Sequence, residues 1–153
     1  MKNIVLLIFL SFCIPSVSHS KTLTFEKCGI TGMTPPPPNL TVENHPYSKK
    51  NYSKTFEKNV FTADLKNKNI QQVQIFTDSF LQERNNSSNT FKFKKIMTSN
   101  FSIKYDDKDY INASGKEYTP SKADGVPYSV VMNKKNKKIT YTTGNQIYEW
   151  QCE

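Results

Sequence analysis

Apolar and polar positions alternate along several short stretches of the chain, a period of two that is typical of half-buried β-strands. Clusters of Asn, Gly, Lys and Asp separate these stretches and favour turns. The alternation predicts strands at residues 22–25, 59–65, 91–94, 101–105, 128–132, 138–142 and 146–150. The last three are so closely spaced that they predict an antiparallel meander.

The period changes over residues 69–84. Five apolar side chains fall within an arc of about 140° on a helical wheel: Ile70, Val73, Phe76, Phe80 and Leu81. Glutamine and acidic residues occupy the other side, so the segment predicts one amphipathic helix. We therefore expect an α+β fold with an antiparallel meander and this helix. An all-β barrel or sandwich is the alternative, because Val, Ile, Phe and Thr within the segment also favour strands.

Three segments interrupt these patterns. Residues 29–58 are rich in proline and lysine and predict an irregular excursion over the surface. Four successive prolines, Pro35–Pro38, cannot donate hydrogen bonds to a helix or a sheet. Asp106–Asp109 predicts a solvated turn, and Gly115–Pro127 predicts irregular structure.

The N-terminus has the form of an export signal. Lys2 precedes the apolar run Ile4–Ile14, Pro15 breaks the run, and small residues at Ser18 and Ser20 suit a signal peptidase. The apolar run is too short to span a bilayer of about 30 Å as a helix. Residues 1–20 are therefore expected to be a cleaved signal peptide. Residues 21–153 are expected to form a single secreted domain, a monomer without stable membrane association.

Export also changes the cysteine count and the charge. Cys13 would leave with the signal, so Cys28 and Cys152 remain as an even pair that predicts one disulfide in an oxidising compartment. Without residues 1–20 the chain keeps 20 Lys+Arg against 13 Asp+Glu, a formal net charge of +7. Nearly all of these cations are lysines, and Arg84 is the single arginine. Lysine is a poor bidentate clamp for phosphate, so the charge also fits a solvated surface.

Six Asn-x-Ser/Thr sequons predict sites of N-glycosylation along a eukaryotic secretory route. They begin at Asn39, Asn51, Asn85, Asn86, Asn100 and Asn112.

The residues with catalytic potential form no recognisable catalytic pattern. His45 is the one histidine outside the signal, and we expect it to be exposed in a loop. One histidine without a free cysteine provides neither a zinc site nor Cys-His catalysis, so we expect no metal, no cofactor and no enzymatic activity. The candidate carboxylates have no acid/base spacing: Glu26, Asp64, Asp78, Glu117 and Glu149. Aromatic residues interleaved with lysines could instead stack RNA bases: Phe91–Lys95, Tyr141, Tyr148 and Trp150.

The C-terminal strands also carry a family resemblance. Tyr128–Asn133, Lys138–Thr140 and Tyr148–Cys152 resemble the end of the RNase-like secreted effectors of powdery mildew fungi, in which two core strands precede a closing cysteine. Phe25–Cys28 resembles the start of that family, with one extra residue before the cysteine. The resemblance implies a microbial-ribonuclease-like scaffold. Ribonuclease catalysis of this type needs two histidines, so it also implies a scaffold that works by binding.

Two hypotheses of function follow. The first is a secreted, non-enzymatic effector that binds a host target, enters host cells and suppresses plant defence; its expected partner is a host protein, with RNA as the alternative. The second is a periplasmic or surface binding protein of an AT-rich bacterium, such as an inhibitor or immunity protein. A secreted nuclease or glycosidase is a third hypothesis, ranked last.

Overall fold

Antiparallel pairing between neighbouring stretches of the chain organises the fold. The computed structural model describes residues 21–87, 92–119 and 122–153, so the predicted signal peptide lies outside the described residues. The elements, in chain order, are β1 (Thr22–Phe25), β2 (Gly29–Thr34), α1 (Tyr52–Thr55), β3 (Phe56–Asp64), β4 (Asn69–Phe76), α2 (Asp78–Ser87), β5 (Ile96–Asp106), β6 (Tyr110–Thr119), β7 (Lys122–Asn133), β8 (Lys138–Thr143) and β9 (Gln146–Gln151).

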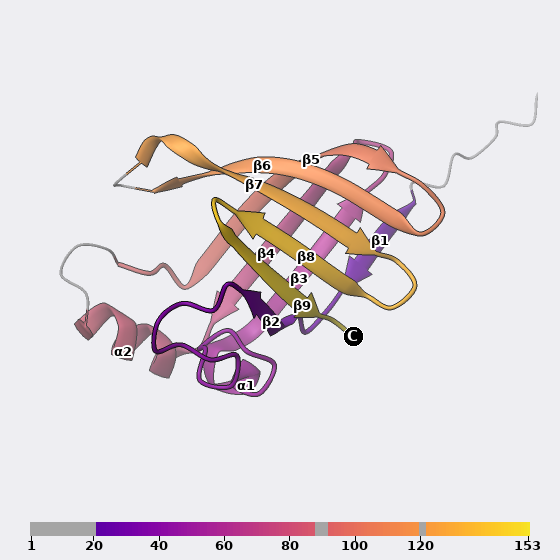
Figure 1. Cartoon of the computed structure of the whole chain (residues 1–153). Helices are drawn as coiled ribbons and strands as arrows, with labels where there is room; N and C mark the ends of the chain where they lie inside the picture. Colours follow the sequence, from indigo (N-terminus) through magenta and orange to yellow (C-terminus); the bar gives the residue numbers. More distant parts are fainter. Residues whose placement is uncertain (1–20, 88–91, 120–121) are drawn as a thin grey trace, which may run out of the picture.

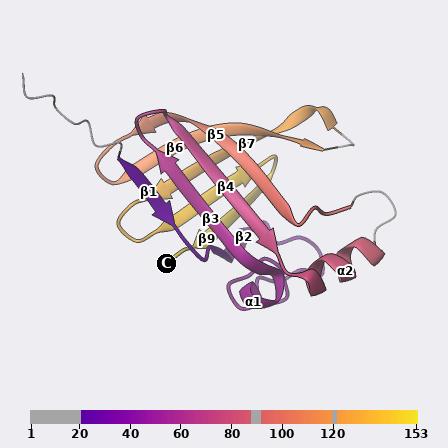
Figure 2. The ribbon, with the colours of Figure 1, turned by 180° about the vertical axis from the view of Figure 1, so that it is seen from behind.

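The strands form one sheet of nine in the order β1-β3-β4-β5-β6-β7-β8-β9-β2. From β3 to β9 each strand pairs antiparallel with the next one in sequence, so most of the sheet is a continuous meander. The sheet curls into a half-barrel: β3 and β4 lie behind β8 and β9 in Figure 1 and in front of them in Figure 2. The two short helices lie together at one end of the half-barrel. The predicted sheet-rich fold is confirmed, and the all-β alternative fits the two short helices equally well.

The inner face of the curl holds the main apolar core. Along most of the described sheet, alternate residues point inward, as the pleat requires. The fully buried members of this core include Phe61, Ile70, Ile111, Val130, Met132 and Ile139. A second, smaller cluster joins the sheet to α2 and is built from Phe56, Phe76 and Phe80. Tyr47 packs against both clusters, so the loop that carries it lies between them.

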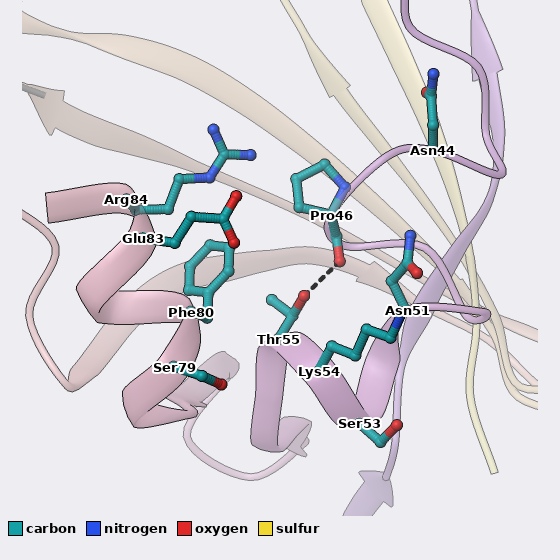
Figure 3. Close-up of a pocket in the computed structure, with 10 residues that line it drawn as sticks. All are labelled: Asn44, Pro46, Asn51, Ser53, Lys54, Thr55, Ser79, Phe80, Glu83 and Arg84. Atoms are coloured by element: carbon teal, nitrogen blue, oxygen red, sulfur yellow. Dashed lines mark hydrogen bonds between the residues drawn. The ribbon is translucent and has the colours of Figure 1, made fainter. Parts of the chain in front are cut away.

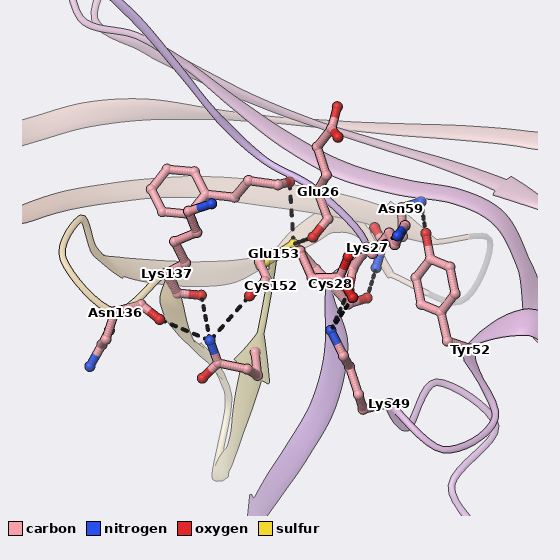
Figure 4. A network of polar contacts seen from close by, with 12 residues as sticks. Glu26, Lys27, Cys28, Lys49, Tyr52, Asn59, Asn136, Lys137, Cys152 and Glu153 are labelled. Atoms are coloured by element: carbon pink, nitrogen blue, oxygen red, sulfur yellow. Dashed lines mark hydrogen bonds and ion pairs between the residues drawn. A yellow bond between two sulfur atoms is a disulfide. The ribbon is translucent and has the colours of Figure 1, made fainter.

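The predicted disulfide joins the connection between the two edge strands, β1 and β2, to the end of β9. Cys28 follows β1 and Cys152 follows β9, and the structure bonds them across 124 positions of sequence. Glu26 and Glu153 exchange backbone hydrogen bonds of 2.7 and 3.2 Å beside the bond. The Cys28 N–H also donates to the Asn59 carbonyl of β3 (Figure 4). At this end, therefore, the edges of the curled sheet meet.

The helix predicted over residues 69–84 is wrong for its first half, which is strand β4. The helical arc treats Val73 as core and Gln72 as solvent, whereas in β4 Gln72 is buried and Val73 is half-buried on the opposite face. Gln72 is accommodated because its Nε2 donates to Asn59 Oδ1 at 3.0 Å, while Asn59 Nδ2 donates to the Cys28 carbonyl at 2.7 Å. An inward position of β4 that would normally hold an apolar residue is thus occupied by Gln72, whose amide is satisfied by the amide of Asn59.

The irregular excursion predicted over residues 29–58 contains regular structure: β2, α1 and the start of β3. β2 breaks the period of two because a bulge between Ile30 and Gly32 turns both Ile30 and Met33 inward. Residues 45–49 then cover the outer edge of β2, with Ile30 N–H donating to the Tyr47 carbonyl at 2.8 Å. Gly29 permits this approach, since a Cβ there would lie 2.6 Å from the Lys49 Cα. The proline run has no helix or strand, as predicted.

Two further predictions need correction. The expected strand at 91–94 is irregular at residues 92–94, and residue 91 lies outside the described residues; Phe93 packs on the second cluster instead. Gly115–Pro127 belongs largely to β6 and β7, because backbone pairing continues where the apolar alternation stops. Gly115 approaches β5 so closely that a Cβ would lie 2.7 Å from the Asn100 carbonyl oxygen. Six predicted strands are confirmed, at 22–25, 59–65, 101–105, 128–132, 138–142 and 146–150. The turn predicted at 106–109 is confirmed for residues 107–109, whereas Asp106 still belongs to β5.

Candidate functional site

Polar side chains interrupt the inner face of the sheet between the two apolar clusters. Along β4 the inward positions run from Ile70 in the main core, through Gln72 and Gln74, to Phe76 in the second cluster. On β5, Ser99 lies directly opposite Gln72 in the register. Apolar residues at these inner positions would add burial energy without any need for hydrogen-bond partners. Such a departure from the pattern of a core marks a candidate functional surface.

The facing wall comes from β7, β8 and β9 and is aromatic. Register pairs place Tyr128 opposite Thr143 and Tyr141 opposite Tyr148. The rings of Tyr128 and Tyr141 are 4.9 Å apart between centroids, a close tilted pair. Trp150 lies deeper on the same face, opposite Ile139 of the main core.

These walls enclose a pocket of about 250 Å³. Ile30, His45 and Tyr47, from β2 and the loop that covers its edge, complete the lining. Its groups therefore converge from six strands and one loop, all held by the backbone pairing of a single sheet. A rigid, concave surface with flat aromatic faces and a few polar groups is typical of a ligand-binding site.

His45 is buried at this pocket, so the predicted exposed loop histidine is wrong. The loop folds back on β2 and holds the imidazole edge-on to Tyr47 and Tyr148, at centroid distances of 5.5 and 6.1 Å. Its Nδ1 accepts the Tyr47 backbone N–H at 3.0 Å. The proton of the neutral ring therefore sits on Nε2. Burial lowers the pKa of the His45 imidazole below its ordinary value, and the positive charge of Arg84 lowers it further.

This arrangement predicts a loss of stability in mild acid. Because the pKa of His45 is lower in the folded state, the unfolded chain takes up the proton first as the pH falls below the ordinary value of 6.5. The stability is complete above that value and declines as the pH falls toward the folded-state pKa. We expect the melting temperature of the wild type to drop between pH 7.5 and pH 5.5.

His45→Asn is the matched variant for this measurement. Its Oδ1 can accept the Tyr47 N–H as Nδ1 does, but the amide does not titrate. The melting temperature of this variant should change less across the same interval. Parallel pH profiles for the two proteins would show that His45 is not the responsible group.

A larger hollow, of about 580 Å³, lies on the outer surface between α1 and α2 (Figure 3). Lys54, Glu83 and Arg84 give its lining both signs of charge. The Arg84 guanidinium lies 5.6 Å from the centroid of the Phe80 ring, and Thr55 Oγ1 donates to the Pro46 carbonyl at 2.6 Å. Its polar groups come from two short helices and a loop, whereas those of the inner pocket are fixed by paired strands. The inner pocket is therefore the stronger candidate site.

The structure sorts the predicted glycosylation sites into two groups. The exposed asparagines are Asn39, Asn86, Asn100 and Asn112. Asn51 and Asn85 are half-buried, and the Nδ2 atoms that would carry a glycan already donate to backbone carbonyls, those of Glu43 and His45 for Asn51 and that of Phe93 for Asn85. A glycan replaces one Nδ2 hydrogen, so modification of Asn51 would break one of its two hydrogen bonds, and modification of Asn85 would require space at a half-buried side chain.

The predicted carboxylates are not brought together as a group. Asp64 bonds the side chain of Asn67, Asp78 pairs with Lys95, and Glu149 pairs with Lys138. Glu26 is exposed beside the disulfide, and the side chain of Glu117 lies outside the described residues.

Of the aromatic residues proposed to stack RNA bases, only some share a surface. Tyr141, Tyr148 and Trp150 line the inner pocket together, whereas Phe93 is packed on the second cluster and Phe91 lies outside the described residues. Lys95 forms ion pairs with Glu57 and Asp78. The predicted interleaving of aromatic and basic residues is thus divided between different parts of the molecule.

In residues 21–87, 92–119 and 122–153, no cluster of three or more His, Cys, Asp or Glu side chains is placed to hold a metal ion. The same residues contain no helix with the length and apolar character needed to span a membrane. No match was found when the chain was compared with models of protein families, with curated proteins and with solved structures.

Proposed function

We propose that the secreted chain is a non-enzymatic binding protein whose binding site is the inner pocket of the half-barrel. The supporting observation is the row of polar residues on the inner face, between two apolar clusters, facing a wall of tyrosines. Polar groups on the inner face of a sheet reduce stability unless they form hydrogen bonds. Hydrogen bonds to a ligand would account for their presence at these positions. The groups that line the pocket are suited to holding and orienting a ligand.

We further propose that the partner belongs to a host, and that binding it suppresses plant defence. Support comes from the export signal and from the resemblance of the C-terminal strands to secreted effectors of powdery mildew fungi. The meander that ends in Cys152, bonded back to Cys28, is compatible with that resemblance. A microbial-ribonuclease origin of the scaffold belongs to the same proposal.

A pair of double variants tests this function. Gln74→Leu with Thr143→Val removes hydrogen-bonding groups from the pocket while nearly conserving volume. Gln71→Leu with Thr98→Val makes the same chemical changes on neighbouring positions that are exposed to solvent. Each protein is expressed in leaf cells with and without residues 1–20, and the oxidative burst after an elicitor is measured.

The wild type and the outer-face variant should reduce the burst, and the pocket variant should not. If the pocket variant suppressed the burst as well as the wild type did, the pocket would not be the functional site. If the wild type left the burst unchanged in both forms, the host-directed function would be wrong.

A further inference from the structure

The inner pocket is uncharged, although the chain as a whole carries a formal net charge of +8. None of the described residues that line it is Asp, Glu, Lys or Arg. A charged ligand would lose its hydration there without gaining a counter-charge, which is strongly unfavourable. The pocket therefore selects a neutral group.

One polar atom at the pocket is buried without a partner among the described residues, and two others keep unused hydrogen-bonding capacity. The Trp150 Nε1–H is buried without an acceptor. His45 uses Nδ1 for the Tyr47 backbone and leaves the Nε2–H unused. Gln72 uses Nε2 for Asn59, and its Oε1 accepts no hydrogen bond. The buried Trp150 donor is destabilising while it lacks an acceptor, so a ligand that accepts from it and also bonds His45 and Gln72 is favoured over a hydrocarbon.

The remaining lining combines flat rings with groups that both donate and accept. Tyr128, Tyr141 and Tyr148 present half-buried rings along one wall. Across from them, the Gln74 amide and the Ser99 hydroxyl can each donate and accept hydrogen bonds. The Thr143 hydroxyl, at the end of β8, can do the same. A ligand hydroxyl has the same dual character, and a face of C–H groups packs favourably on an aromatic ring.

We propose that the pocket binds one neutral sugar ring, such as the terminal residue of an uncharged oligosaccharide. This inference rests on the proposed binding function and gives its ligand a chemical class. A pyranose has a C–H face for the tyrosine wall and hydroxyls at its rim for His45, Gln72 and Gln74. The volume of about 250 Å³ is slightly below the range of drug-sized pockets, about 300–1,000 Å³, and so suits a single ring.

Trp150 provides the measurement, because it is the single tryptophan of the chain and lines the pocket. The secreted, disulfide-bonded protein is titrated with cellotetraose, xylotetraose, mannotetraose and chitotetraose while tryptophan emission is recorded. At least one should change the emission saturably, with a Kd on the order of 0.1–1 mM, as expected for contacts with a single ring.

The two double variants described above test where the sugar binds, the pocket variant as the test and the outer-face variant as its control. Gln74→Leu with Thr143→Val should weaken binding by roughly 5- to 150-fold, since two hydrogen bonds to the ligand are lost. Gln71→Leu with Thr98→Val should bind as the wild type does. Equal binding by both variants would place the sugar elsewhere and overturn the inference.

Three other probes separate this inference from the proposed function: trigalacturonic acid, adenosine and 1-naphthol. If one of them saturates the pocket and none of the four sugars does, the sugar assignment is wrong and the binding pocket stands. If no probe changes the emission, the sugar assignment is equally wrong. The leaf experiment then decides the proposed function independently, through its dependence on Gln74 and Thr143.

Discussion

Replacing Cys28 and Cys152 together by alanine is expected to lower the melting temperature by roughly 15–25 °C. The bond closes a loop across 124 positions of sequence, for which the loss of chain entropy in the unfolded state is worth about 5 kcal/mol. A domain of this size is typically stable by about 5–15 kcal/mol in total. The disulfide therefore contributes a large share of the stability.

The bond lies where the chain's last strand meets the connection between the two edge strands. It joins the connection between β1 and β2 to the end of β9, where the edges of the sheet meet (Figure 4). The nearby ion pairs of Glu153 with Lys27 and Lys49 are largely exposed, and exposed pairs contribute little. Without the bond, the end of β9 is still held by its pairing with β2 and β8 and by the backbone hydrogen bonds of Glu26 with Glu153, but the unfolded chain regains the entropy of an open loop.

Reduction of the wild type is the control. Dithiothreitol should lower the melting temperature of the wild type to that of the double variant and should leave the double variant unchanged. A double variant that melts within about 3 °C of the oxidised wild type would contradict the assigned stabilisation.

The C-terminal meander over residues 128–150 could be predicted because its signals are local. In β8, Ile139 and Tyr141 face inward at a spacing of two, and short polar turns fix the register with β7 and β9. The disulfide could also be predicted, since two cysteines in a chain that is predicted to be exported have one possible pairing. Neither inference requires knowledge of distant contacts.

The pocket could not be predicted from the sequence alone. Gln72 and Gln74 look like the solvent side of a helix until the register with β3 and β5 shows that they face inward. The hydrogen bond from Gln72 to Asn59 spans 13 positions, and no local pattern reports it. One signal was available: residues 73–77 are rich in β-branched and aromatic side chains, which favour a strand. With β4 as a strand, the two glutamines become inner residues.

Among the residues of β4, Phe76 is the one whose truncation is expected to destabilise the protein most. Its side chain is fully buried, and its ring stacks on those of Phe56 and Phe80 at centroid distances of 5.3 and 5.2 Å. The ring of Phe93 makes a T-shaped contact at a centroid distance of 5.9 Å. Through Phe80 it attaches α2 to the sheet. Phe76→Ala should therefore destabilise the protein by about 3–5 kcal/mol, the usual range for a buried phenylalanine.

Val73→Ala is the matched control, because helix and strand give opposite expectations for it. On a helix, Val73 and Phe76 are three residues apart and share a face, so both truncations would be costly. In β4 their odd separation places them on opposite faces, and Val73 is only half-buried. Urea denaturation should therefore show a loss for Val73→Ala of about 1 kcal/mol, well below that for Phe76→Ala. Comparable losses for the two variants would contradict the strand and, with it, the inward-facing glutamines of the pocket.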